Sequence, residues 1–149
     1  MKTYEKISIL ECDIDDMFNF HLDLNNLKAI TPKDTQVTLI DEMFTPKEGD
    51  ILRLKTVKNF IPTRWDVKIE QINKPNLLVD VALKSPFKSW KHSHIFTQKE
   101  DELCELKDVV EYEIPFGFFG ALFDSFVKSE LDKMFTYRHE VTQNILKRR

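Results

Sequence analysis

Glycine is scarce in this sequence, with 3 residues among 149, whereas phenylalanine occurs 12 times. Glycine takes positive φ angles more readily than other residues, so a chain with only three glycines has few positions for tight turns. We predict that Gly49 permits a hairpin turn at Pro46–Asp50, and that Gly117 and Gly120 permit the passage from the last strand to a helix. The excess of phenylalanine indicates a large apolar surface to line.

Long apolar runs, an excess of basic residues and closely spaced cysteines are also missing. No apolar stretch approaches the roughly 20 residues of a membrane-spanning helix, and the N-terminus lacks the apolar segment of a secretory signal. The formal net charge of −3 argues against a nucleic-acid partner. Cys12 and Cys104 are the two cysteines, without CxxC spacing, which favours reduced, buried thiols and a cytoplasmic location.

Motifs for nucleotide binding and for common hydrolases are absent as well. The sequence has no GxGxxG, Walker A, HExxH or GxSxG pattern, so the corresponding chemistries lose support, and no cofactor is expected. The acidic group Asp13, Asp15 and Asp16 lacks the glycine and glutamate of a calcium loop. We interpret it as the start of a helix with Asp13 as the N-cap.

The hydrophobic pattern predicts a strand, two short helices, six further strands and one long helix. Residues 4–10 alternate as a strand, and residues 13–22 and 24–30 are typical of short helices. Apolar residues recur at every second position from 35 to 114, and at three- and four-residue intervals from 118 to 147. This β-α-α-β6-α order indicates one α+β domain over residues 1–149, with about seven antiparallel strands and the long C-terminal helix on one face.

Polar side chains are predicted to point toward the long helix from the last two strands. Alternation places His92 and His94 on the inner face of one strand, and Asp108 and Tyr112 on the inner face of the next. Arg138 of the long helix is a further candidate for this group. A buried carboxylate needs a donor, so the group either orients a ligand in a cavity or forms a structural hydrogen-bond network.

The same residues admit two other hypotheses. The spacing of His92 and His94 places both imidazoles on one face of a strand, where an inward aspartate could complete a zinc site. One such pattern is weak support, so we assign no metal site. A histidine polarised by Asp108 could act as a general base, but no nucleophile accompanies it. We therefore assign no catalytic residue, and a binding protein is more expected than an enzyme.

Aromatic residues supply the apolar surface that the composition indicates. Trp65 shares its strand face with apolar neighbours and is interpreted as core, which places Arg64 outside. Phenylalanines crowd the start of the long helix, where they form either the core between sheet and helix or the wall and mouth of a pocket; they are Phe116, Phe118, Phe119, Phe123 and Phe126. If they are exposed, this mouth could instead dock a protein or a second copy of the chain.

Several short segments form a further pattern. They are Asn25-Asn-Leu27 with Thr31-Pro32, Pro62-Thr-Arg-Trp65, Ser85-Pro-Phe-Lys-Ser-Trp90, His92-Ser-His-Ile-Phe96, Asp108-Val-Val-Glu-Tyr112, Pro115-Phe-Gly117 and Phe135-Thr-Tyr-Arg138. With the element order, they resemble a bacterial ligand-binding group of the START-like superfamily (SRPBCC, Bet v 1-like), which includes polyketide cyclases and dehydrases. In that group Gly-Pro-Phe usually precedes Trp-x-His-x-His, and here Ser85 replaces the glycine.

The resemblance implies a helix-grip fold, in which a curved sheet wraps the long helix and leaves a cavity for a small hydrophobic molecule such as a lipid or polyketide. The ligand-binding residues are then expected to be Trp90, His92, His94, Asp108, Tyr112, Phe119, Phe123 and Arg138. Two alternatives stay open. One is a cyclase or dehydratase that uses a His–Asp pair in the same cavity, and the other is a non-catalytic interaction module, for example a homodimer.

Overall fold

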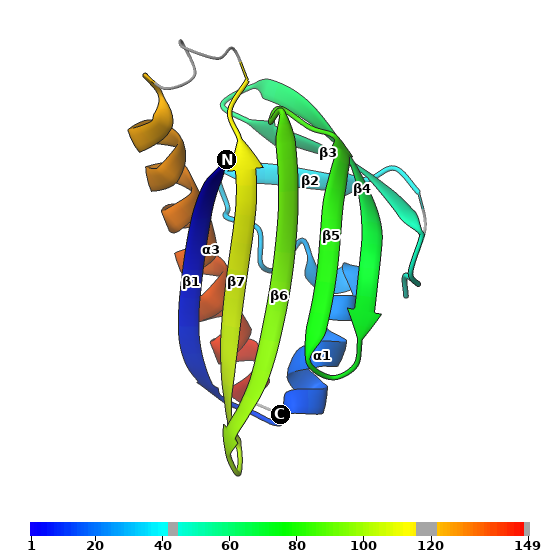
Figure 1. Cartoon of the computed structure of the whole chain (residues 1–149), viewed down its shortest axis with the longest axis vertical. Helices are drawn as coiled ribbons and strands as arrows, with labels where there is room; N and C mark the ends of the chain where they lie inside the picture. The colour runs from blue at the N-terminus through cyan, green and yellow to red at the C-terminus, as the bar shows by residue number, and fades with distance from the viewer. Residues whose placement is uncertain (42–44, 116–121, 148–149) are drawn as a thin grey trace.

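Seven strands form one antiparallel sheet that curves around a long helix (Figure 1). The computed structural model describes residues 1–41, 45–115 and 122–147. The elements in chain order are β1 (Lys2–Glu11), α1 (Ile14–Leu22), the short 3₁₀ helix η1 (Leu24–Asn26), β2 (Thr35–Leu39), β3 (Ile51–Lys58), β4 (Ile61–Asn73), β5 (Leu77–Lys84), β6 (Ser89–Glu100), β7 (Leu103–Glu113) and α3 (Asp124–Lys147).

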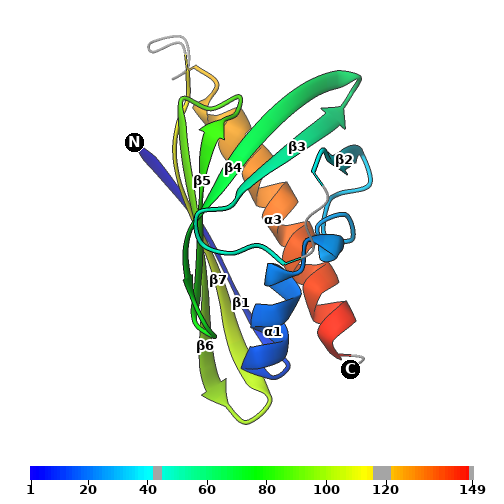
Figure 2. The ribbon, with the colours of Figure 1, turned by 90° about the vertical axis from the view of Figure 1, so that its right-hand side faces the viewer.

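The strand order across the sheet is β1-β7-β6-β5-β4-β3-β2, so β1 and β2 are its two edges. All strands after β2 follow as neighbours, because short turns can join only adjacent antiparallel strands. Register shifts interrupt the pairing of β4 with β5 at Asp66/Val67 and at Ile69/Gln71. Such bulges bend a strand, and Figure 2 shows β3 and β4 leaning over the face that carries α1 and α3.

The predicted element order is confirmed, including the six strands after the short helices. Asp13 caps α1 by accepting hydrogen bonds from the backbone of Asp15 and Asp16, and Gly49 takes a φ of 89° in the predicted turn. The predicted helix at 24–30 is wrong beyond η1. Residues 27–30 form turns instead, and the Asn26 side chain donates to the carbonyl of Phe20 in the last turn of α1.

The buried face of α3 differs from the predicted apolar pattern, because it includes the polar residues His139 and Thr142. Its buried residues are Leu131, Phe135, His139, Thr142 and Leu146. Of the two interpretations of Phe123 and Phe126, packing in the core between sheet and helix is wrong, because their side chains are 58% and 63% exposed. A place at the mouth of a pocket stays a prediction. Phe126 lies on the side of α3 opposite the buried residues, because its neighbour Val127 packs toward the interior. Phe116, Phe118, Phe119, Gly117 and Gly120 lie outside the described residues.

Two apolar clusters make up the interior between the sheet and the helices. One joins α1, β6, β7 and the end of α3, and contains Phe18, Phe20 and Phe96. The other contains Trp90 and Phe135, with Trp65 and Phe87 packed against it in half-buried positions. Trp65 therefore lies on the inner face and Arg64 on the exposed face, as predicted.

The two cysteines are free and buried in the first cluster, which confirms the prediction of reduced thiols. The Cys104 thiol donates to the carbonyl oxygen of Cys12 at 3.2 Å, and burial raises the pKa of Cys12 to about 12. Within the described residues, no helix has the length and apolar character needed to cross a membrane.

Candidate functional site

All four histidines of the chain meet two aspartates in the interior, between the two apolar clusters. They are His21 of α1, His92 and His94 of β6, and His139 of α3, with Asp80 of β5 and Asp108 of β7. We call these six residues the His–Asp cluster. The strand register creates it, because Asp80 lies opposite His92 on β5–β6, and His94 lies opposite Asp108 on β6–β7.

Asp108 is the centre of the cluster and is only 3% exposed. His92 Nε2 donates to its Oδ1, and His139 Nε2 donates to its Oδ2, both at 2.7 Å. The Ser8 hydroxyl of β1 completes this chain by donating to His139 Nδ1 at 2.7 Å. Burial alone would raise the pKa of Asp108, but the hydrogen bonds from His139 and His92 and the nearby His94 ring hold it well below the usual range.

His94 lies between the two carboxylates. Its Nε2 donates to Asp80 Oδ2 at 3.0 Å, and its Nδ1 lies 3.2 Å from Asp108 Oδ1. That second contact has the distance of an ion pair but not the angle of a hydrogen bond, so Nδ1 has no hydrogen-bond partner among the described residues. Burial alone would lower the pKa of His94, but Asp108 and Asp80 raise it to about 9.

His92 stacks on His94 with 3.8 Å between the ring centroids. Burial, together with the neighbouring charge of His94, lowers the pKa of His92. Burial also lowers the pKa of His21 to about 4, and the Nδ1 of His21 donates to the Met17 carbonyl at 2.8 Å. At neutral pH the cluster thus contains a charged His94 beside neutral His92 and His21.

Arg138 of α3 lies beside the cluster, as predicted. Its guanidinium carbon is 5.6 Å from the centre of the Phe135 ring, and its Nε has no hydrogen-bond partner in the described part of the chain. Burial lowers the pKa of Arg138, although the charges of Asp108 and Asp80 act in the opposite direction. Thr142, one turn further along α3, likewise has a buried hydroxyl that pairs with none of the described residues.

Trp90 and Tyr112 are buried, but they belong to an aromatic group rather than to the His–Asp cluster. Trp90 lies opposite Tyr112 in the sheet, and its ring is 4.8 Å from Phe87 and 5.2 Å from Trp65 between centroids. Tyr112 makes an edge contact with Phe87 at 5.6 Å. Trp90 also approaches His92 at 6.5 Å, so the aromatic group borders the cluster on this side.

A cavity of about 10 Å³ lies within the cluster, which is space for one water molecule. It is lined by His21, Ile30, His92, His94, Leu106, Asp108, Phe135, Arg138, His139 and Thr142. A larger depression of about 370 Å³ is lined by residues from the end of β1 and the start of α1, from the β6–β7 turn and from the end of α3. Its lining is largely acidic and includes none of the predicted site residues.

Asp80, His139 and His21 were not among the predicted site residues. Asp80 is the one charged residue in the otherwise apolar segment Leu77–Leu83, and that isolation was a signal for it. His139 follows Phe135 by four residues and precedes Thr142 by three, which places all three on one helix face. The apolar pattern overlooks this face because two of the three residues are polar. His21 offered no comparable signal.

Comparison with solved structures agrees with this architecture. A protein of Thermus thermophilus is 14% identical, with a TM-score of 0.75 over 96% of this chain and 95% of that one. A START superfamily protein from Mycobacterium smegmatis is 8% identical, with a TM-score of 0.73 over 98% and 97% of the two chains. Ara h 8.0201, a Bet v 1 allergen, is 13% identical, with a TM-score of 0.64 over 95% and 97%.

The chain has the helix-grip fold of START and Bet v 1-like proteins. No protein-family model matches its sequence, and no curated protein is significantly similar to it. At such low identities the structural similarity establishes the fold alone, since one fold hosts many functions.

Of the residues predicted to bind a ligand in this helix-grip fold, His92, His94, Asp108 and Arg138 lie together at the cavity. Trp90 and Tyr112 lie in the adjoining aromatic group, Phe123 is exposed, and Phe119 lies outside the described residues. Their role in ligand binding stays a prediction.

Proposed function

We propose that this helix-grip chain binds a small, mainly apolar molecule between the sheet and α3, with one polar group of the ligand directed at the His–Asp cluster. The observation that supports this most is a buried polar cluster beside a cavity, next to half-buried aromatic residues. Ligand sites of this kind combine apolar walls with a few convergent polar groups. Trp65, Phe87 and Trp90 would supply the wall nearest the cluster.

The polar group of the ligand is a carbonyl or hydroxyl oxygen. Arg138 Nε and the Thr142 hydroxyl are buried donors without a partner among the described residues, and both side chains line the cavity. Leaving a buried donor unpaired costs about 1–3 kcal/mol. An oxygen atom that accepts from both would remove this cost, which an apolar atom in the same place would not.

Binding requires more space than the cavity of about 10 Å³ provides, because drug-sized ligands occupy roughly 300 Å³ or more. The attachment of α3 suggests where this space opens. Tyr4 of β1 donates to Asp132 at 2.8 Å, and His139 joins α3 to β1 and β7. On the side of β3, Lys58 pairs with Glu130 at 2.7 Å. We infer that α3 moves away from β3 and β4 and stays attached to β1.

The alternative of a cyclase or dehydratase needs a histidine nitrogen that faces a substrate. The nitrogens of both His92 and His94 face the carboxylates of Asp80 or Asp108. This arrangement favours binding over general-base catalysis. A homodimer and a cytoplasmic location both stay predictions, and gel filtration tests the first.

Native mass spectrometry of the protein purified from its own host tests the proposal directly, because a bound molecule adds its mass to the chain. A matched pair of probes tests the polar group. We expect acetylnaphthalene to raise the melting temperature more than ethylnaphthalene, which has similar size but no carbonyl. A protein that retains no molecule and responds equally to both probes would contradict the proposal.

Thr142→Val gives a second test at the level of one hydroxyl. We expect acetylnaphthalene to bind about fivefold more weakly, since one hydrogen bond contributes about 1 kcal/mol. The melting temperature without probe should not fall, because valine removes an unpaired buried hydroxyl and keeps the shape. Thr136→Val on the same helix lies outside the cavity lining and is the control, for which unchanged binding is expected. Equal affinities for both variants would rule out the assigned role of Thr142.

A further inference from the structure

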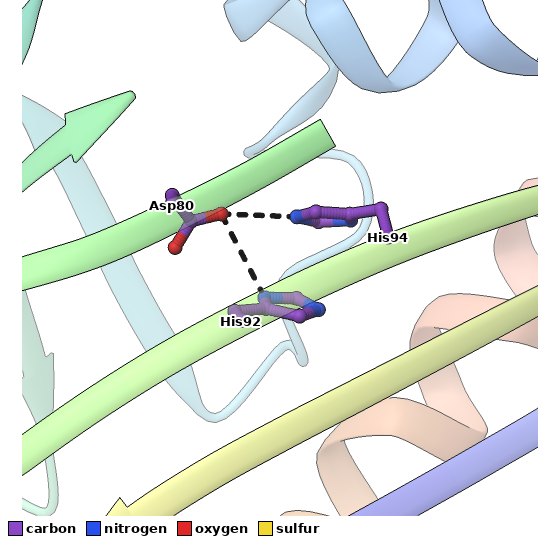
Figure 3. A group of neighbouring side chains, drawn as sticks. All are labelled: Asp80, His92 and His94. Carbon is purple, nitrogen blue, oxygen red and sulfur yellow. Dashed lines mark hydrogen bonds and ion pairs between the residues drawn. The ribbon is translucent and has the colours of Figure 1, made fainter. Parts of the chain in front are cut away.

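Three potential ligand atoms for a metal ion converge inside the His–Asp cluster. Asp80, His92 and His94 each present one such atom, and these atoms all lie within 4.8 Å of one another (Figure 3). Asp80 Oδ2 is 3.0 Å from His94 Nε2 and 3.9 Å from His92 Nδ1. Ligand atoms around tetrahedral Zn²⁺ are roughly 3.3 Å apart, given bonds of about 2.0–2.1 Å. The observed separations lie on both sides of that value.

The hydrogen bonds of His92 leave one ring nitrogen facing an anion. His92 Nε2 lies 2.7 Å from Asp108 Oδ1 and must carry the hydrogen there, because a carboxylate only accepts. In the neutral ring, Nδ1 then has a lone pair, and this lone pair faces Asp80 Oδ2 at 3.9 Å. A lone pair and a carboxylate repel each other unless a cation lies between them. A metal ion bound here would face both atoms, and it would take the place of the hydrogen that His94 Nε2 donates to Asp80.

Asp108 supplies the outer support that metal-binding histidines usually have. Ligating histidines commonly donate their remote N–H to a carboxylate, which fixes the ring orientation and strengthens the ligand. Asp108 Oδ1 receives the remote nitrogen of His92 at 2.7 Å and lies 3.2 Å from the remote nitrogen of His94. His139 holds the other oxygen of Asp108 at 2.7 Å. Asp108 therefore orients His92 by a hydrogen bond, and its charge lies beside His94.

We propose that Asp80 Oδ2, His92 Nδ1 and His94 Nε2 bind a divalent first-row transition-metal ion of the Zn²⁺ class. Two imidazoles and one carboxylate suit such an ion, and three protein ligands leave a position for a water molecule. The cavity of about 10 Å³ borders both histidines and has space for that water. This inference goes beyond the proposed function and does not rest on it, since the metal is held by protein atoms alone.

Titration of chelator-treated protein with Co²⁺ and Zn²⁺ tests the site. Co²⁺ bound by two imidazoles and a carboxylate in tetrahedral geometry gives visible absorption, so both the stoichiometry and the geometry are measured. We expect one ion per chain. Asp80→Asn and His94→Gln should weaken binding at least about 100-fold, because each removes a direct ligand. Asp108→Asn should weaken it about 10- to 100-fold by releasing the orientation of the His92 ring.

His21→Gln is the matched control, since His21 belongs to the same cluster but donates to the Met17 carbonyl instead of facing Asp80. It should bind Co²⁺ with unchanged affinity. Equal loss in His21→Gln and Asp80→Asn would overturn the proposal, as would the absence of saturable binding by the wild-type chain.

Nitrogen NMR of the wild-type chain avoids variants that fail to fold. Zn²⁺ should shift the resonances of His92 Nδ1 and His94 Nε2 and leave both nitrogens of His21 in place. Shifts spread over all four histidines, or none at all, would contradict the assignment. Failure of the ligand proposal leaves these results unchanged, because retained small molecules and metal ions are detected separately.

Discussion

Asp108 is the residue on which β6, β7 and α3 meet. Both of its oxygens accept hydrogen bonds from histidines, and the chain of bonds continues through His139 to Ser8 on β1. Hydrogen bonds to a charged group are stronger than neutral ones, at about 1.5–3 kcal/mol each. A single side chain thus links two strands of the sheet to the helix from within the interior.

Asp108→Asn should lower the free energy of unfolding by about 3 kcal/mol, because the amide keeps the shape but loses two charge-assisted bonds. The NH₂ group of the introduced asparagine would also face a histidine N–H, so two hydrogen-bond donors would meet without an acceptor. Urea denaturation followed by circular dichroism measures this change. Asp66→Asn is the control, since its pair with Arg64 is exposed and should change stability by less than about 0.5 kcal/mol. Similar losses in both variants would show that Asp108 does not have this role.

Among the elements, α3 shows how one helix divides between buried and exposed parts. Phe126 and Phe135 lie on the same helix, yet Phe126 is 63% exposed and Phe135 is 0% exposed. Phe135 contacts Tyr4 at 5.5 Å and His92 at 5.1 Å between ring centroids, so it packs on both β1 and β6. Phe126 lies on the opposite side of α3, although its neighbour Val127 packs against the same cluster as Phe135.

Alanine substitutions at these two positions should differ widely in effect. Phe135→Ala leaves a cavity in the core and should cost about 3–5 kcal/mol, whereas Phe126→Ala should change stability by less than about 0.5 kcal/mol. Thermal unfolding of both variants under identical conditions measures the contrast. A large loss for Phe126→Ala would mean that this residue is covered in solution, and gel filtration would then show whether a second copy covers it.

Across the whole molecule, the helix is attached to the sheet unequally. Tyr4, Ser8 and Asp108 bind the middle of α3 to β1 and β7. On the opposite side, the Lys58 ammonium of β3 contacts Glu130 at 2.7 Å and Asp34 at 3.6 Å. This ion pair closes the side on which we expect a ligand to enter, and it is partly exposed to solvent.

Glu130→Gln should destabilise the protein by about 0.5 kcal/mol at pH 7, the size usual for a partly exposed ion pair. The hydrogen bond from Lys58 lowers the pKa of Glu130 below its usual 4.5 in the folded chain. The stabilisation is therefore fully present above the unfolded pKa and is lost as the pH falls through the folded value. Urea midpoints of wild type and variant should converge below pH 4, whereas a difference that persists there would contradict this account.

The same ion pair gives a kinetic expectation under the proposed function. If α3 separates from β3 when a ligand enters, Glu130→Gln should bind acetylnaphthalene faster than the wild type, by up to about twofold for a loss of about 0.5 kcal/mol. Stopped-flow fluorescence measures the rate of binding. Lys133→Gln is the control, because Lys133 also pairs with Glu130, at 3.7 Å, but lies on α3 itself and does not join the helix to β3. Its rate of binding should equal that of the wild type.

The sequence by itself determined the element order and the direction of the strand side chains. Successive side chains of a strand point to opposite faces, so alternation alone places His92, His94 and Asp108 on the inner face. Some features depend only on residues close together in the sequence and can be predicted without the rest of the molecule. They are the N-cap at Asp13, the turn at Pro46–Asp50 and the short segments around Trp90. The fold could be predicted for that reason.

Only the tertiary structure decided which inner residues meet and which face of α3 is covered. Asp80 and His139 reach Asp108 or its neighbours from 28 and 31 residues away in the sequence, and strand register and helix docking set that proximity. The sequence left open whether Phe126 belongs to the core or to the mouth of a pocket, and it overlooked His139, because the docking of α3 decides which of its faces is covered. Burial depends on what packs against a residue, and distant parts of the chain supply that contact.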